Sequence, residues 1–251
     1  MLFYGKTDVG RKRDANQDDF VIKKYSDDTI AAVVCDGMGG ANGGNIASAV
    51  AAAAFMKILD EKESEAPSFF GVSDKKLLGI LAEAVNEANI SVYDLSADDP
   101  SLEGMGTTLV GCVICGEKIF VVNVGDSRLY AFRKDGFEQI SHDHSFVQML
   151  VDMGKTTSEE AKASKMKNLI TRAVGTARKV ESDVFTSELS HGDTVVLCSD
   201  GLSNLVEPEE IANEVKDAVA TGDFQSACEN LVALANERGG VDNITAVLLS
   251  L

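Results

Sequence analysis

Five aspartates of this chain stand next to runs of apolar residues. The runs AAVVC, VVLCS and FVVNVG lead directly into Asp36, Asp200 and Asp126. Asp18 stands just before a short apolar stretch, and Asp242 lies one residue before the run ITAVLL. A carboxylate at the end of a buried strand is costly unless it is paired with a cation or bound to a metal. These aspartates are therefore the first candidates for a functional site.

The chain offers few basic residues that could neutralise such a group. It has 40 acidic residues against 23 lysines and arginines, and few of the basic residues are close to the five aspartates in sequence. Converging carboxylates repel one another strongly, and Mg²⁺ and Mn²⁺ relieve that repulsion because they prefer oxygen ligands. A single pair such as Asp36-Gly37 is more often an ordinary turn. The joint pattern of five favours a metal site.

Several short runs of apolar residues, in which polar residues do not alternate with apolar ones, must position these aspartates. Such runs are typical of strands covered on both faces. They lie at Ile30–Cys35, Ile119–Val124, Val195–Cys198 and Ala246–Leu249. Three strands are expected in close succession at Thr107–Cys115, Lys118–Val124 and Ser127–Phe132. Because links of two residues suit only antiparallel neighbours, we expect these three strands to form one meander.

Helices are predicted where apolar residues recur at helical spacing. The four ranges are Asn45–Glu61, Leu77–Leu95, Pro208–Val219 and Phe224–Arg238. One pair follows the early strands and the other pair lies near the end of the chain. Strands covered on both faces, together with paired helices, indicate stacked sheets with helices outside them.

Composition excludes several classes of partner. A net charge of −17 disfavours nucleic acid and anionic membranes as partners. No apolar stretch approaches the eighteen or so residues of a membrane span, and Met1–Arg13 has no secretion signal, so we expect a cytoplasmic protein. The five cysteines are an odd number and are expected to be free thiols. No linker or low-complexity segment divides the 251 residues, which favours one domain.

Six segments carry a resemblance to a known family. In chain order they are RDANQD (13–18), VVCDGMGG (33–40), GTTLV (106–110), NVGDSR (123–128), LCSDGL (197–202) and VDNIT (241–245). Together they resemble the bacterial members of the type 2C, or PPM, family of metal-dependent serine/threonine protein phosphatases. The resemblance implies an α+β fold, a four-layer α-β-β-α sandwich of two stacked antiparallel sheets flanked by antiparallel helices. It also implies one catalytic domain over residues 1–251, with a mobile flap at about 145–168.

The resemblance also implies a role for each aspartate. Asp36 would bridge two tightly bound Mn²⁺ or Mg²⁺ ions, and Gly37 would add its carbonyl oxygen. Asp200 and Asp242 would complete one of these two metal sites, and Asp18 would hold metal-bound water or ligate directly. A third and weaker ion would lie between Asp126 and Asp200.

The implied reaction is hydrolysis of phosphoserine and phosphothreonine in proteins. A hydroxide bridging two metal ions would attack phosphorus directly, without a phosphoenzyme. Arg13 would bind the phosphate through its planar fork of donors, so the expected catalytic residues are Arg13, Asp36 and Asp200. The expected partners are phosphorylated proteins, among them a serine/threonine kinase and its targets. The absence of an appended domain favours a monomer.

The chain departs from the family pattern at three positions. Gln17 stands where many members have Glu, and Met38 stands where animal members have a His proposed as general acid. Asn45 replaces a frequent Glu. Met38 means that this chain does not use that general acid.

Other chemistries fit the sequence less well. No cysteine is followed six residues later by the Arg that a cysteine-dependent phosphatase needs, and no D-x-D motif suggests an aspartyl-phosphate enzyme. His142 and His144 are interpreted as a polar pair at a strand end rather than as metal ligands. A non-hydrolysing relative and a metal-dependent nuclease are the alternative functions. The three aspartates Asp36, Asp200 and Asp242 argue against the first, and the acidic charge argues against the second.

Overall fold

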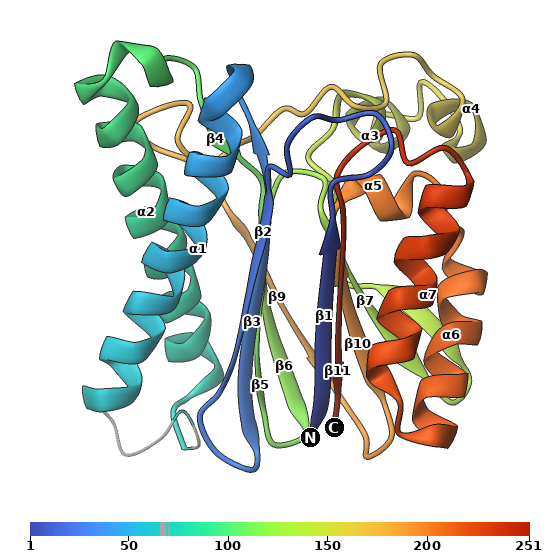
Figure 1. The fold of residues 1–251 in the computed structure, drawn as a ribbon. Helices are drawn as coiled ribbons and strands as arrows, with labels where there is room; N and C mark the ends of the chain where they lie inside the picture. Colours follow the sequence, from blue (N-terminus) through green and yellow to red (C-terminus); the bar gives the residue numbers. More distant parts are fainter. Residues whose placement is uncertain (66–68, 70) are drawn as a thin grey trace.

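Two antiparallel sheets lie face to face at the centre of the computed structural model, which describes residues 1–65, 69 and 71–251 (Figure 1). The first sheet has the strand order β1 (Leu2–Asp8), β11 (Ile244–Ser250), β10 (Thr194–Cys198), β7 (Arg128–Arg133) and β8 (Gly136–Gln139). The second has the order β2 (Asp18–Lys24), β3 (Thr29–Met38), β5 (Leu109–Cys115), β6 (Lys118–Val124) and β9 (Asp183–Glu188), and β4 (Gly106–Thr107) pairs with β3.

Two pairs of helices cover the outer faces of the sheets (Figure 1). Helices α1 (Gly40–Glu65) and α2 (Asp74–Asp98) pack on the second sheet, and α6 (Pro208–Thr221) and α7 (Phe224–Glu237) pack on the first. The shorter helices are α3 (Phe146–Asp152), α4 (Ser158–Lys162), α5 (Asp200–Ser203) and the 3₁₀ helix η1 (Pro100–Leu102). The predicted four-layer α-β-β-α sandwich is confirmed.

The apolar side chains form three buried layers, which explains why the central strands lack polar alternation. In β3, Ala31, Val33 and Cys35 face the helices, whereas Ile30, Ala32 and Val34 face the other sheet. Both faces of such a strand are buried, so every position favours an apolar residue. All five cysteines are free, as predicted.

The prediction that β5, β6 and β7 form one meander is wrong. β5 and β6 pair as expected, but β7 lies in the other sheet and pairs with β10. The link between β6 and β7 turns a corner between the stacked sheets, and Gly125 makes this corner with a φ of 105°. That backbone region is open to glycine and costly for other residues. Asp126 therefore lies where the chain passes from one sheet to the other.

Several elements extend beyond the predicted ranges or had no prediction. β3 continues to Met38, so Asp36 lies within the strand rather than after it, and the range Thr107–Cys115 is interrupted at Thr108. The N-terminal strand β1 was not predicted, because LFYGKTD lacks an apolar pattern and owes its conformation to pairing with β11 along its whole length. Within the described residues, no helix is long and apolar enough to cross a membrane.

Candidate active site

The five aspartates meet at one end of the sandwich, although they come from four separate parts of the chain. Asp18 pairs with Asp36 across β2 and β3, Asp126 follows β6, Asp200 begins α5 directly after β10, and Asp242 precedes β11. A pocket of about 300 Å³ opens there. Its lining is Arg13, Gln17, Asp36, Gly37, Met38, Gly39, Thr108, Asp126, Asn168, Ile170, Asp200 and Asp242. Of the residues predicted for the site, Asp18 alone lies outside this lining.

Asp18 is buried and joins the two sheets. Its Oδ2 accepts hydrogen bonds from Ser199 Oγ at 2.7 Å and from Thr245 Oγ1 at 2.6 Å. Ser199 directly follows β10 and Thr245 lies in β11, so both donors belong to the first sheet or adjoin it. Its Oδ1 is buried without a hydrogen-bond partner among the described residues. Burial raises the pKa of Asp18 to about 7, although the two hydroxyl donors act in the opposite direction. The fold thus holds a carboxyl group whose charged form lacks sufficient compensation from the protein.

The other pocket carboxylates are in the same situation. Burial raises the pKa of Asp36 well above its usual range, and the negative charges of Asp18 and Asp200 raise it further. Burial, together with repulsion from a neighbouring aspartate, raises the pKa of Asp126 to about 8 and that of Asp200 to about 6. Asp200 Oδ2 accepts from Asn204 Nδ2 at 2.9 Å, whereas Oδ1 is buried without a partner among the described residues.

These donors fit a hard divalent cation. Buried oxygens without partners, such as Asp18 Oδ1 and Asp200 Oδ1, are what an oxygen-preferring ion would satisfy. No three His, Cys, Asp or Glu side chains in the described part of the chain are gathered closely enough to enclose a single ion. Mg²⁺ is commonly held by one or two carboxylates and keeps several waters, so water would complete the coordination of an ion bound here.

The backbone at Gly37 has no space for a side chain. A Cβ there would overlap the carbonyl oxygen of Gly44 and lie 2.6 Å from the carbonyl oxygen of Gln17. The Gly37 amide donates to that Gln17 oxygen at 3.0 Å. The Gln17 side chain in turn packs against Gly44, since a Cβ on Gly44 would lie 2.6 Å from Gln17 Cδ. At the position where many family members have Glu, this chain therefore has a glutamine packed against α1.

Arg13 and Asp242 form an ion pair at the mouth of the pocket. Arg13 Nη2 lies 2.8 Å from Asp242 Oδ2, and the Arg13 side chain is 53% exposed. The remaining oxygen, Asp242 Oδ1, accepts from the Asn243 amide at 2.9 Å. Both oxygens of Asp242 are thus engaged by the protein, in contrast to Asp18 and Asp200.

Asn243 fixes the loop that carries Arg13, a role that the sequence reasoning missed. Its Oδ1 accepts from the Gln17 amide at 2.8 Å, and its Nδ2 donates to the carbonyls of Val9 at 2.9 Å and Ala15 at 3.0 Å. These three bonds connect the strand end beside Asp242 to the whole 9–17 loop. The sequence feature that could have identified Asn243 is the VDNIT segment, which contains it.

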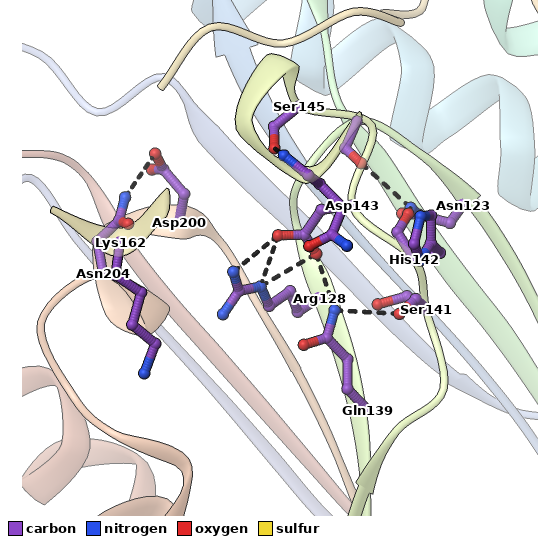
Figure 2. A network of polar contacts seen from close by, with 12 residues as sticks. Asn123, Arg128, Gln139, Ser141, His142, Asp143, Ser145, Lys162, Asp200 and Asn204 are labelled. Carbon is purple, nitrogen blue, oxygen red and sulfur yellow. Dashed lines mark hydrogen bonds and ion pairs between the residues drawn. The ribbon is translucent and has the colours of Figure 1, made fainter. Parts of the chain in front are cut away.

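A half-buried cation beside Asp126, Arg128, was also missed. Arg128 donates from Nη2 to Asp143 Oδ2 at 2.7 Å and from Nε to both Asp143 oxygens, and Gln139 Nε2 donates to Asp143 Oδ1 at 2.8 Å (Figure 2). Burial disfavours the charged guanidinium, but Asp143 keeps the pKa of Arg128 above its usual value. The positive charge of Arg128 in turn acts to lower the pKa of Asp126 and Asp200. The NVGDSR segment contains Arg128, but nothing local in it indicates Asp143 as the partner.

The segment 145–168, called the flap below, lies beside the pocket and carries α3 and α4. Asn168 at its end lines the pocket, and Lys162 Nζ donates to Glu207 Oε2 at the start of α6 at 2.6 Å. A second cavity of about 250 Å³ lies under the flap and shares Asp126 and Asp200 with the first. Lys167 lines this cavity as well.

The two histidines lie between β8 and α3 and do not line the pocket. His142 Nε2 contacts Asp152 Oδ2 of α3 at 2.9 Å and is half-exposed. His144 is buried and hydrogen-bonded on both ring nitrogens. The pair is therefore not a simple strand-end feature, because each histidine contacts a different element.

Comparisons with known proteins agree with this geometry. Residues 9–248 match the sequence family described as Protein phosphatase 2C. The serine/threonine phosphatase stp of Listeria innocua is 33% identical over 244 residues, which cover 97% of this chain and 93% of that protein. The crystal structure of the Mycobacterium tuberculosis serine/threonine phosphatase PstP/Ppp is similar with a TM-score of 0.85 and 34% identity, over 99% of this chain and 97% of that one.

A manganese-bound structure is also similar. The catalytic domain of serine threonine protein phosphatase PstP in complex with 2 manganese ions matches with a TM-score of 0.80 and 33% identity. The match covers 98% of this chain and 96% of that one.

The raised carboxyl pKa values predict how pH affects the metal-free protein. Below about pH 4 the aspartates are protonated in both states, and as pH rises the unfolded chain ionises first. The free energy of unfolding should therefore fall between about pH 4 and pH 8, the range bounded by the raised values for Asp200, Asp18 and Asp126. Urea unfolding in chelator across this range measures it, and Asp18→Asn should flatten the fall.

The matched control is Asp135→Asn, on the exposed turn between β7 and β8. This variant should keep the wild-type dependence on pH. A metal-free protein whose stability rises from pH 5 to pH 8, or an Asp18→Asn variant with the same slope as wild type, would contradict the account of the buried carboxyls.

Proposed function

The chain belongs to the protein phosphatase 2C family, and we propose that it hydrolyses phosphoserine and phosphothreonine in proteins at the pocket lined by Asp36 and Asp200, with the help of Mn²⁺ or Mg²⁺. Membership of this family makes it a serine/threonine protein phosphatase. The observation that carries the proposal is the convergence of five aspartates at one end of the sandwich, four of them in the lining of a pocket whose described lining has one arginine. A cationic centre is needed there before a phosphate dianion can approach.

The proposed assignment of ligands is the one that the family resemblance implies. Asp36 would be shared by two tightly bound ions and Gly37 would add its carbonyl oxygen, and Asp200 and Asp242 would complete one site. Asp18, outside the pocket lining, acts through water or ligates directly through its unpartnered Oδ1. When bound, the ions supply Lewis-acid activation of water and neutralise the phosphate charge.

A third, weaker ion is proposed between Asp126 and Asp200, which line both cavities. Fewer charged oxygens reach this position, and the guanidinium of Arg128 acts on both aspartates electrostatically. A nearby positive charge opposes the binding of a cation. This supports a lower affinity than that of the pair at Asp36.

Direct transfer to water, without a phosphoenzyme, is supported by the pocket lining. Among the described lining residues there is no Cys or His that could act as a nucleophile. The hydroxyl of Thr108 donates to or accepts from Ser127 Oγ at 2.7 Å and contacts the Asp36 amide at 3.0 Å, so it is engaged in holding the strand ends. Met38 also lines the pocket, and its thioether carries no proton to donate to the leaving oxygen.

Arg13 is the proposed phosphate-binding group. Among the described residues that line the pocket, Arg13 is the one that carries a guanidinium group. Its ion pair with Asp242 holds it at the mouth of the pocket. Planar guanidinium donors match two phosphate oxygens at once. With 53% of its side chain exposed, Arg13 is accessible to an arriving substrate.

The substrates proposed are phosphorylated proteins in the cytoplasm, among them a serine/threonine kinase and its targets, with the enzyme acting as a monomer. The family membership supports the substrate class. The net charge of −17 disfavours nucleic acid.

The proposal predicts strict metal dependence. Hydrolysis of p-nitrophenyl phosphate and of a phosphothreonine peptide should require Mn²⁺ or Mg²⁺, and Asp36→Asn should lower kcat by orders of magnitude with the fold intact by circular dichroism. Asp14→Asn, an exposed aspartate in the Arg13 loop, is the control and should keep activity. Full turnover in excess chelator would exclude the metal mechanism.

Arg13 should contribute mainly to substrate binding. Arg13→Ala is expected to raise KM for a phosphopeptide and to cost about 2–3 kcal/mol in kcat/KM, because charge-assisted bonds to the phosphate are lost. Arg13→Lys should recover little, since a lysine lacks the planar fork. Arg11→Ala removes a neighbouring exposed guanidinium outside the pocket lining and should change neither constant. An unchanged KM in Arg13→Ala would place the phosphate-binding group elsewhere.

A further inference from the structure

The turn that carries Asp126 is held from one side by His144. The Gly125 amide donates to His144 Nδ1 at 3.1 Å, and the His144 amide donates to the Gly125 carbonyl at 2.9 Å. Asn123 Nδ2 adds bonds to the carbonyls of Gly125 at 3.1 Å and His142 at 2.8 Å (Figure 2). Gly125 has a φ of 105°, a backbone conformation that is open to glycine and costly for other residues. The contacts with His144 thus define the direction in which the next residue, Asp126, leaves β6.

The same histidine lies at the base of the flap. The His144 carbonyl accepts a hydrogen bond from the Thr171 amide at 2.7 Å. Two residues further on, the Phe146 amide donates to the Leu169 carbonyl at 2.7 Å. Ser145 and Ile170 form an antiparallel bridge between these two bonds. Both ends of the flap therefore meet at His144, although they are more than twenty residues apart in sequence.

The second ring nitrogen attaches His144 to β9. Because the Gly125 amide can only donate, Nδ1 must accept, and the neutral ring carries its proton on Nε2. Nε2 lies 3.1 Å from Asp183 Oδ2 and 3.0 Å from Arg172 Nη1, and Arg172 Nη1 donates to Asp183 Oδ1 at 2.8 Å. Burial lowers the pKa of His144, which keeps the ring in this neutral form. Arg172 follows the flap, so Asp183 fixes the end of the flap and the imidazole together.

We infer that His144 is a positioning residue that joins the Asp126 turn to both ends of the flap, so that the place of Asp126 beside Asp200 depends on the flap base. The inference rests on the cation-binding role proposed for Asp126. The imidazole does not line the catalytic pocket and acts through Gly125. Alternatives such as a metal ligand or proton donor are disfavoured, because both ring nitrogens already have partners.

Two near-isosteric substitutions separate the contacts of His144. His144→Asn places its amide oxygen near the position of Nδ1 and can accept from Gly125. His144→Gln extends toward Asp183 but leaves the Gly125 amide without an acceptor. Amide hydrogen exchange at Gly125, measured by NMR in the metal-free protein, should be about tenfold faster in His144→Gln and close to wild type in His144→Asn.

Calorimetric titration with Mn²⁺ then measures the effect on the site. His144→Gln should weaken the low-affinity Mn²⁺ site about tenfold and leave the high-affinity sites unchanged, and His144→Asn should restore it. A merely structural histidine would lower thermal stability in both variants without this selective loss. The control His142→Ala removes a half-exposed ring that contacts α3 and should change neither measurement.

The outcomes distinguish this inference from the proposed function. If Gly125 exchange and Mn²⁺ affinity are the same in His144→Gln and wild type, the positioning role is wrong, whatever the phosphatase activity. If the asparagine variant fails to restore what the glutamine variant loses, the contact with Gly125 is not the cause and the inference is also overturned. If the variants show the predicted exchange pattern but the wild-type protein has no metal-dependent hydrolysis, the proposed function is wrong. The positioning contact between His144 and Gly125 is then still supported.

Discussion

The burial of several carboxylates close together is the constraint on which the rest of the structure depends. Asp18, Asp36, Asp126 and Asp200 lie at or near strand ends, in a region where burial and neighbouring charges raise the pKa of each. No packing of apolar side chains can offset this, because the cost lies in the loss of hydration around the charges. The protein supplies partial compensation through Ser199 and Thr245, and divalent ions would supply the remainder.

The sandwich provides this arrangement by bringing ends of both sheets to the same place. Asp18 on β2 accepts hydrogen bonds from residues at the ends of β10 and β11, so a single carboxyl group joins the sheets. The corner at Gly125 carries the chain from β6 to β7 and leaves Asp126 facing the same region. A frame of paired strands holds the carboxylates close, and the neighbouring flap, with its base at His144, contains short helices and turns.

Much of this could be predicted from the sequence, because an apolar run followed by an aspartate is a local pattern. Asp36 and Asp200 were recognisable in this way, and the family resemblance ordered them into one site. The change of sheet after β6 was not predictable, since a short link satisfies both a hairpin and a corner, and the choice depends on what each strand packs against. The Arg128–Asp143 pair and the Gly125–His144 contact join residues 15 and 19 positions apart through tertiary structure. β1 was not predictable for the same reason, because its conformation depends on pairing with β11 and its own residues have no apolar pattern.

The most direct test of the central claim is the number of Mn²⁺ ions bound per chain by wild type and by Asp36→Asn, measured by equilibrium dialysis beside circular dichroism of both proteins. Asp36 interacts electrostatically with each of the other four carboxylates, Asp18, Asp126, Asp200 and Asp242. The account predicts two tightly bound ions in wild type and the loss of tight binding by both in a folded Asp36→Asn variant, because one carboxylate is shared. A folded variant that binds two ions with wild-type affinity would contradict it.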